Sequence, residues 1–539
     1  MADDSLAGVL AYHDATKQYF HAAAKGPGFL DWGNQPNPFR RYTGASLVAL
    51  DPVEPADTPL WDEVLGLEVK PEVLDRHFIS QLLYDSLAIS AWKVAGGEPW
   101  ALRVNPSSGN LHPTEGYVLC GPVEGLNDKP GIYHYAPREH ALEMRAEVPP
   151  ELWNTLTTDL PKSVVLMGLA SIHWREAWKY GERAFRYCQH DAGHAIAAIT
   201  LAAACLGWKA RVLDTLGDAQ LATIMGLHDF GDAEPEEPDC LIALYPVGEC
   251  IAGWVPPSEA VKQFGGLAWK GRANVLSSSH ANWPIIDQVA KAAAKPLGNE
   301  MPLSHGSVQP EINPSTAISA RRIIRQRRSA VAMDGKTFMS ADDFYRMLVR
   351  ILPDTARAPW HAWPFEPFVH LFLFVHRVRG IDPGLYILLR SPSAQEDMQA
   401  AFAEGFEWAA PADCPQGLPL FCLIRGDARA TARQLSCQQD IASDGCVAFA
   451  MLAEFEWALK VGSWMYPRLH WECGMIGQML YLEAEAMGLS GTGIGCFFDD
   501  PVCELLGLPA GQHEWQSLYH FTIGGAVNDD RLTSDSKNP

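Results

Sequence analysis

Apolar positions along the chain form long runs with helical spacing and short, nearly continuous runs. The helical spacing predicts helices over residues 71–93, 178–206, 341–352, 441–461 and 475–487. The short runs, rich in Val, Ile, Leu, Phe and Tyr, predict strands over residues 115–121, 239–248, 369–378, 384–389 and 418–425. Because the two kinds mix without a strict alternation of strand and helix, the pattern favours an α+β fold over a doubly wound parallel sheet.

An internal repeat lies behind this pattern, since residues 178–208 align without a gap with residues 459–489. The register brings together Gly181 with Gly462, Asp191 with Glu472, Gly193 with Gly474, and Gly207 with Gly488. We expect two related modules, residues 1–254 and 316–539, that arose by tandem duplication. The stretch 255–315 is rich in Pro, Ser and Gly, which is typical of a linker, and has helical spacing only over 285–295.

Composition narrows the class of protein. The chain has 42 Lys and Arg against 64 Asp and Glu, a formal charge of −22, which argues against a nucleic-acid partner. Its 12 cysteines form no C-x-x-C pair, and the N-terminus lacks the pattern of a signal peptide. The longest apolar run, 195–208, is too short to span a bilayer. We therefore expect a cytoplasmic protein without a membrane partner, with mostly buried free thiols.

Three polar or glycine-rich segments could hold a ligand. "RQRRSA" (325–330) offers guanidinium forks and a hydroxyl to a phosphate monoester, although a solvated basic face would also explain it. "GLSGTGIGCFFDD" (488–500) would let the backbone approach a planar ligand, although a helix C-cap with a loop is an alternative. "RVNPSSGNLHPTEGY" (103–117) is too polar and too broken for a core helix or strand, and it occurs only once.

Two histidines, His190 and His194, have the i, i+4 spacing of metal ligands on a helix. The repeat has Trp471 and Met475 at these positions, whereas the acid between the histidines has a counterpart in both copies. We expect packing and capping roles here and no metal, and keep a metal hydrolase as an alternative function.

In their order along the chain, these segments resemble the nitroreductase-like flavoprotein superfamily. Within it, the chain is similar to the SagB-type group, which is related to thiazole/oxazole-peptide oxidoreductases. The resemblance also includes "GIYHYAPREHALE" (131–143), "WKYGERAFRYCQHDAGH" (178–194) and "TIGGAVNDDRL" (522–532). It implies a mostly antiparallel sheet wrapped by helices in each module. It further implies FMN bound between two subunits, whose place two fused modules would take as an intramolecular pseudo-dimer.

The resemblance assigns roles to particular residues. Arg327, Arg328 and Ser329 would hold the phosphate and ribityl end of FMN, with Arg531 as a further phosphate candidate. The backbone of Gly493, Ile494 and Gly495 would lie beside the ring, with a donor towards flavin N5. The site would be closed from the other module by Pro106, Ser107, Ser108 and Asn110. Proton handling would fall to Lys179 and Tyr180.

The two modules depart from the family pattern in complementary ways. In module 1, "PFRRYTGA" (38–45) has Tyr42 in place of the serine, and Val212 and Asp214 replace Gly493 and Gly495. In module 2, "TARAPWHAWPF" (355–365) stands where the Pro-Ser-Ser loop would be. We expect one composite FMN site per chain and one degenerate site.

The expected function is hydride transfer through flavin N5 on a small-molecule or peptide substrate, with NAD(P)H as a candidate donor. A non-catalytic flavin-binding protein is the alternative, and further homo-oligomerisation stays open.

Overall fold

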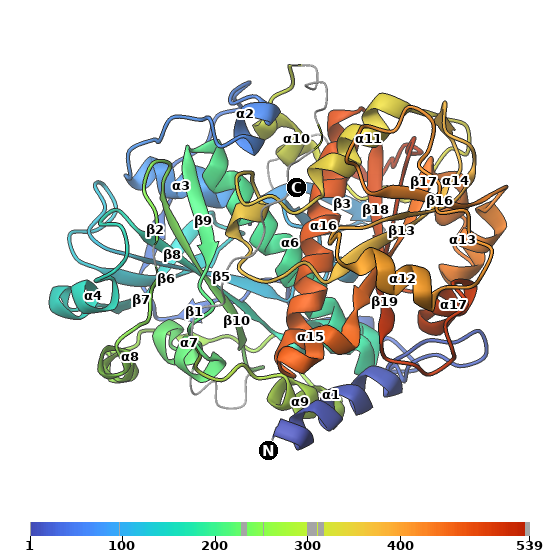
Figure 1. Ribbon diagram of the computed structural model, residues 1–539. Helices are drawn as coiled ribbons and strands as arrows, with labels where there is room; N and C mark the ends of the chain where they lie inside the picture. The colour runs from blue at the N-terminus through green and yellow to red at the C-terminus, as the bar shows by residue number, and fades with distance from the viewer. Residues whose placement is uncertain are drawn as a thin grey trace.

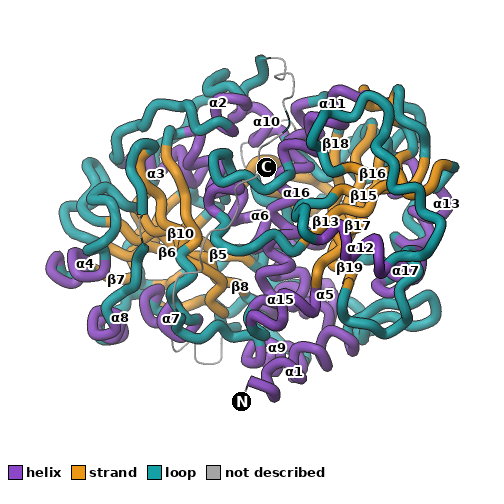
Figure 2. The backbone as a smooth tube through the Cα atoms, in the orientation of Figure 1, coloured by secondary structure: helices purple, strands orange, loops and turns teal. Residues whose placement is uncertain are grey.

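Two antiparallel sheets lie on opposite sides of a central pair of long helices (Figures 1 and 2). The structure is a computed structural model that describes residues 2–95, 97–227, 234–251, 253–298, 310 and 317–533. We call the seven-stranded sheet with its helices module 1 and the six-stranded sheet with its helices module 2. Every strand pairing in the two large sheets is antiparallel over the described residues, which confirms the expected α+β class.

The strand order differs from the chain order in both sheets. The sheet of module 1 runs β2 (Leu47–Ala49), β7 (Ala141–Glu147), β6 (Gly131–Ala136), β5 (Thr114–Cys120), β8 (Val165–Ser171), β10 (Glu237–Pro246), β9 (Trp208–Val212). The sheet of module 2 runs β16 (Leu420–Arg425), β15 (Gly384–Leu388), β13 (Val369–Val375), β17 (Val447–Glu454), β19 (Trp515–Gly524), β18 (Ser490–Ile494). The edge strands β9 and β18 are the ones that follow the two central helices along the chain.

The central helices are α6 (Ala184–Cys205) and α16 (Met465–Ala486), and they pack against each other. Their aligned glycines meet at the contact: a Cβ on Gly474 would lie 2.8 Å from the Cα of Gly193, and one on Gly193 would overlap the backbone of Trp471. The repeated glycines therefore allow close approach of two backbones. Within the described ranges, none of the helices combines the length and the apolar character needed to cross a membrane.

Both chain ends cross to the other module. Helix α1 (Ala2–Ala15) and the turn after it contact module 2, where His13 Nε2 lies 2.8 Å from Gln516 Oε1 and Lys17 pairs with Asp500 at 2.7 Å. At the other end, β20 (Leu532–Thr533) pairs with β3 (Ile89–Ala95), which forms a hairpin with β4 (Glu98–Arg103). The chain ends thus lie in space with the module to which they do not belong in sequence. The module boundaries 1–254 and 316–539 stay a prediction.

The expected linker is more structured than its composition indicates. Helix α9 (Pro284–Ala292) covers most of the expected helical stretch, and α8 (Ser258–Gly265) precedes it. Strand β11 (Arg272–Ala273) pairs with β1 (Tyr42–Thr43). Residues 299–309 and 311–315 of this stretch lie outside the described residues.

The expected elements are mostly confirmed, with two errors. All five expected strands are present, as β5, β10, β13, β15 and β16. The helix expected over 441–461 is wrong, because the buried strand β17 occupies its centre between short helices α14 (Ile441–Asp444) and α15 (Phe455–Val461). A fully buried apolar run has no periodicity that separates strand from helix. Likewise, the helix expected over 71–93 is α3 (Arg76–Tyr84) followed by β3.

Candidate functional site

A cavity of about 300 Å³ lies between the two modules. Module 1 lines it with the loop before β5 and with residues of α5 (His173–Tyr180) and α6, among them Pro106, Ser107, Ser108, Gly109, Tyr180, Tyr187 and Asp191. Module 2 lines it with Ser329, Tyr481, Gly493, Ile494, Gly495, Cys496 and Tyr519. The sequence-predicted ring-side residues of both modules therefore face one space.

A second cavity of about 180 Å³ shares Pro106, Ser107 and Ser329 with the first. Its wall also contains Arg327 and Arg328, which were predicted to hold the phosphate and ribityl end, and Asn110, which was predicted to close the site from the other module. The two cavities are neighbours that meet at the Ser107 and Ser329 positions. Together they have the size of an ordinary small-ligand site, which spans a few hundred cubic ångströms.

Arg327 is a buried cation of the smaller cavity, with only 3% of its surface exposed. Its Nη2 donates to the carbonyl oxygen of Arg103 at 3.0 Å, while Nε and Nη1 are buried without a hydrogen-bond partner in the described structure. Buried donors are nearly always paired in native proteins, and a guanidinium fork suits a phosphate. These two unpaired nitrogens fit an anionic group such as the phosphate of FMN, although burial lowers the pKa of Arg327.

Arg328 and Ser329 have other partners. The Arg328 guanidinium donates to the carbonyl oxygens of Arg325, Arg327 and Ser90, so it anchors this segment on module 1. The hydroxyl of Ser329 lies 2.8 Å from that of Tyr481.

The glycine segment after α16 forms the opposite wall. A Cβ on Gly493 would overlap the hydroxyl of Tyr519, and one on Gly495 would overlap the ring of Tyr187. Glycine is therefore required for tyrosines to pack along the cavity. The N–H of Gly493 donates to the Tyr481 hydroxyl at 2.9 Å, so one of the three backbone donors expected to be available towards flavin N5 is engaged within the protein.

The Pro-Ser-Ser loop is held by an acid on α6. The backbone N–H and the hydroxyl of Ser108 donate to Asp191 Oδ1 at 3.0 and 3.1 Å. Asn110, at φ +61°, donates from Nδ2 to the carbonyl oxygen of Ala101 at 2.9 Å. Gly109, at φ +59°, leaves room for the residues that the resemblance assigns to proton handling. A Cβ there would lie 2.5 Å from the hydroxyl of Tyr180 and 3.0 Å from Nζ of Lys179.

Lys179 and Tyr180 lie at the end of α5, next to Gly109. Tyr180 lines the 300 Å³ cavity, and burial together with Glu176 raises the pKa of its hydroxyl. Lys179 lines a neighbouring cavity of about 630 Å³ with Trp92, Trp100 and other residues. Arg531 lies apart from these three cavities: its half-exposed side chain pairs with Asp529 at 2.7 Å.

Asp191 is the functional candidate that the sequence interpretation missed, because its counterpart Glu472 indicated a packing or capping role. It faces the larger cavity and is 2% exposed. Burial raises its pKa to about 7, against the opposing effect of hydrogen bonds from Ser107 and Ser108. A carboxyl group with this pKa can hold or release a proton near neutral pH. The only signal in the sequence was an acid at equivalent places in both repeats.

His190 and His194 are both buried. The ring of His190 stacks on Tyr519 at 4.3 Å, and His194 Nε2 lies 3.2 Å from the Tyr519 hydroxyl. Across the part of the chain that the structure describes, no group of three or more His, Cys, Asp or Glu side chains could hold a metal ion. These contacts are packing and hydrogen-bonding contacts.

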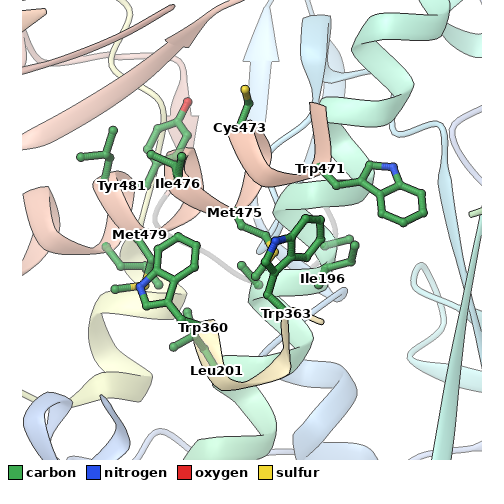
Figure 3. Close-up of a cluster of buried hydrophobic side chains, with 14 of the residues drawn as sticks. Ile196, Leu201, Trp360, Trp363, Trp471, Cys473, Met475, Ile476, Met479 and Tyr481 are labelled. Atoms are coloured by element: carbon green, nitrogen blue, oxygen red, sulfur yellow. The ribbon is translucent and has the colours of Figure 1, made fainter. Parts of the chain in front are cut away.

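The reciprocal position, beside β9, is filled by side chains. His361 Nε2 accepts a hydrogen bond from the N–H of Ala210 in β9 at 3.0 Å, and Trp360, Trp363 and Phe365 are buried. Figure 3 shows the two tryptophans between residues of the central helices, namely Ile196, Leu201, Met475 and Met479. In module 1, Arg40 is bound to Glu236, and Arg41 to Glu143 and Glu139.

Glu472, the repeat counterpart of Asp191, already has partners in this reciprocal region. It is ion-paired with Arg390 and accepts the N–H of Phe368 at 3.1 Å. Asp191 instead accepts a backbone N–H and a hydroxyl from the same serine. Both acids thus accept one backbone hydrogen bond, but the second partner of Glu472 is an arginine and that of Asp191 is a serine hydroxyl.

Comparisons with known proteins agree with this architecture. The sequence model of the Nitroreductase family matches residues 94–244 and 385–525, one region in each module and more than half of the chain. A protein of Methanocaldococcus jannaschii, provisionally named nitroreductase MJ1384, is 26% identical over 129 residues. The match covers 23% of this chain and 64% of that protein, so it leaves about a third of the relative unmatched.

Among solved structures, a protein from Anabaena variabilis provisionally described as a nitroreductase has a similar fold. It has a TM-score of 0.66 at 21% identity, over 96% of this chain and 99% of that chain. The E. coli microcin synthetase McbBCD complex reaches a TM-score of only 0.28 at 18% identity, over 46% of this chain and 95% of that chain, which supports no statement about substrate. From the family match in both modules, this chain belongs to the nitroreductase family.

Proposed function

We propose that this protein is an FMN-dependent oxidoreductase with a single composite flavin site between its two modules, which derive from a tandem duplication. The observation that supports this most directly is the joined pair of cavities with Arg327 in the smaller one. Its two unpaired nitrogens match a phosphate, and the larger cavity beside it is lined by backbone and tyrosine side chains. The two modules would then act as an intramolecular pseudo-dimer.

In this proposal, Arg327 and Ser329 hold the phosphate and ribityl end, and Asn110 closes the smaller cavity. The loop 106–109 and the glycines 493 and 495 enclose the ring. Bound FMN would supply two-electron chemistry through hydride transfer at N5. The resemblance to SagB-type proteins favours oxidation of a substrate, with reduction of an acceptor by NAD(P)H as the other direction.

The residues of this chain would position the ring and manage protons. Asp191 lies in the cavity wall with a pKa near 7, so it can exchange a proton during turnover. Tyr180 remains protonated at neutral pH because burial raises its pKa, so its hydroxyl can donate a hydrogen bond. Lys179 lines the 630 Å³ cavity, whose wall also contains Gly109, and we propose that substrate approaches from this cavity.

The test is the visible spectrum of the chain purified with added FMN, compared with two arginine variants. Arg327→Ala should weaken FMN binding by about 2–5 kcal/mol, at least about 30-fold, because a buried phosphate would lose its charged partner. Arg322→Ala is the matched control, since Arg322 is exposed on the same segment.

Each outcome separates the candidate functions. Oxidised-flavin bands that NAD(P)H or a substrate bleaches, with turnover, support an oxidoreductase. Flavin that binds but is reduced only by dithionite supports the non-catalytic flavin-binding alternative. A chain that shows no flavin affinity, or loses it equally in Arg322→Ala, contradicts the proposal.

A further inference from the structure

Two cysteines from separate loops meet beside the larger cavity. Cys496 directly follows the glycine segment and lines the cavity, and Cys437 lies in the loop after α13 (Arg429–Leu435). Their Sγ atoms are 2.8 Å apart. Cys496 is exposed and Cys437 is half-buried. A disulfide, with its S–S bond of about 2.05 Å, requires the sulfurs to close by less than about 1 Å.

The surroundings of the pair distinguish the two thiols. The two thiols share a hydrogen bond, and this contact is the main cause that lowers the pKa of Cys496 to about 7. The cation Arg183 lowers it further, while burial and Asp499 oppose the effect. The same contact raises the pKa of Cys437. The thiolate is the reactive form of cysteine, so Cys496 has the properties of an attacking thiol and Cys437 those of a resolving thiol.

Two tyrosines that interact with Cys496 are neutral at physiological pH. Tyr187 from α6 has its pKa raised to about 12 by burial, and burial also raises that of Tyr180 from α5. The oxygen Oε1 of Gln18 lies 3.4 Å from the sulfur of Cys496 and 3.6 Å from that of Cys437. The amide oxygen of Gln18 therefore accepts a hydrogen bond from a protonated thiol and keeps the two sulfurs close together.

Most other cysteines lack these properties. Cys188 and Cys473, for example, are fully buried on the central helices, where burial raises their pKa. Cys250 in module 1 is exposed. Reactive thiols in proteins are accessible and have lowered pKa values, whereas buried ones are inert.

We propose that Cys437 and Cys496 form a thiol–disulfide exchange site that reduces an external disulfide. The Cys496 thiolate attacks a disulfide R–S–S–R, which breaks its S–S bond, forms a Cys496–S–S–R mixed disulfide and releases one R–S⁻. Cys437 then loses its proton and attacks the Cys496 sulfur, which releases the second R–S⁻. The chain is left with a Cys437–Cys496 disulfide and the substrate is reduced to two thiols. A small dithiol returns the two electrons and two protons and restores both cysteines.

This exchange is independent of the proposed flavin chemistry, because all reacting atoms belong to the chain, the disulfide and the dithiol. The flavin-free chain is therefore the right material for the test. If that chain exchanges disulfides but never binds FMN, the flavin proposal fails and this one stands. If it binds FMN but does not exchange disulfides, the exchange proposal fails and the flavin proposal stands.

The experiment equilibrates the reduced full-length chain with oxidised glutathione at pH 7.5 and then alkylates the remaining thiols. Peptide mass spectrometry should find a Cys437–Cys496 disulfide with two glutathiones released per chain. In Cys437→Ser, a glutathione adduct on Cys496 should persist at least tenfold longer, because the resolving thiol is gone. Cys496→Ser should react at least tenfold more slowly at this site, and Cys250→Ser should match the parent chain.

A second readout is the rate of iodoacetamide alkylation of Cys496 against pH. The rate should rise with a midpoint near pH 7 in the parent chain, and Cys437→Ser should retain part of this shift through the serine hydroxyl, whereas Cys437→Ala should move the midpoint upwards. The proposal is overturned if glutathione reacts with Cys250 while no Cys437–Cys496 bond forms. It is also overturned if the adduct on Cys496 decays equally fast in Cys437→Ser. Mapping the bond in the parent chain decides the question even if a variant fails to fold.

Discussion

At the residue scale, Asp191 and its counterpart Glu472 show how one aligned position acquires two roles. Each accepts a backbone N–H, from Ser108 and Phe368 respectively. Glu472 is neutralised by Arg390, whereas Asp191 faces a cavity with a pKa raised to about 7. An alignment of the two repeats reveals the shared acid but not its neighbours. The roles of such residues depend on side chains that lie far away along the chain.

Asp191 should make the stability of the flavin-free chain depend on pH. Its folded-state pKa of about 7 lies above the unfolded value of about 3.9, so the native state binds more protons between about pH 4 and 7. The unfolding free energy should therefore fall as pH rises through this window, by at most about 4 kcal/mol. Asp191→Asn keeps an acceptor for Ser108 and should lose this fall, which urea unfolding at pH 5, 6, 7 and 8 would measure.

The control for this measurement is Asp128→Asn, because Asp128 is exposed. Its unfolding free energy should follow the parent chain at every pH. Parallel curves for Asp191→Asn and the parent chain would contradict the assignment of a protonated Asp191.

At the element scale, local pattern was sufficient where glycine or proline lay near the ends of a short apolar run. The strands β5, β10, β13, β15 and β16 were predicted for this reason. The strand β17 was mistaken for helix because it is central in its sheet and apolar throughout, between β13 and β19. Tertiary pairing, and not the pattern of its own residues, decides its conformation.

The crossing of α6 and α16 predicts the effect of a single added methyl group. A Cβ at residue 193 would overlap backbone atoms of Trp471, which have no freedom to move aside. Gly193→Ala should therefore cost about 1–3 kcal/mol or more, despite the better helix propensity of alanine. Denaturant unfolding measures this cost. Gly265→Ala in α8 is the control, since its Cβ would lie 3.4 Å from a Thr223 methyl group, and a comparable loss there would contradict the explanation.

At the scale of the whole molecule, the candidate site exists only because the two modules pack together. The loop at 106–110 and the segments at 327–329 and 493–495 come from different modules. Each chain end also crosses to the opposite module, α1 to module 2 and β20 to module 1. If the modules were separated, the cavity would be lost, and each module would also lose its contacts with the chain end that crosses to it.

The filled reciprocal position predicts one FMN per chain. The short helix Trp360–Ala362 contacts β9, and Trp360, Trp363 and Phe365 are buried, so we expect that this segment leaves no room for a second flavin. Flavin released by denaturation, divided by chain concentration, should give a ratio near one. Arg327→Ala should bring this ratio close to zero, because no second site would remain. A ratio near two in the parent chain would contradict the prediction of a single site.

The sequence by itself determined the α+β class, the repeat, the central glycines and the segments that line the candidate site, since propensity, spacing and polarity are local properties. Tertiary structure alone decided that β17 is a strand, that Gly493 donates to Tyr481, and that Asp191 faces a cavity. It also brought together Cys437 and Cys496, two scattered thiols in the sequence. These features depend on burial and on contacts between residues that folding makes neighbours, which no local pattern records.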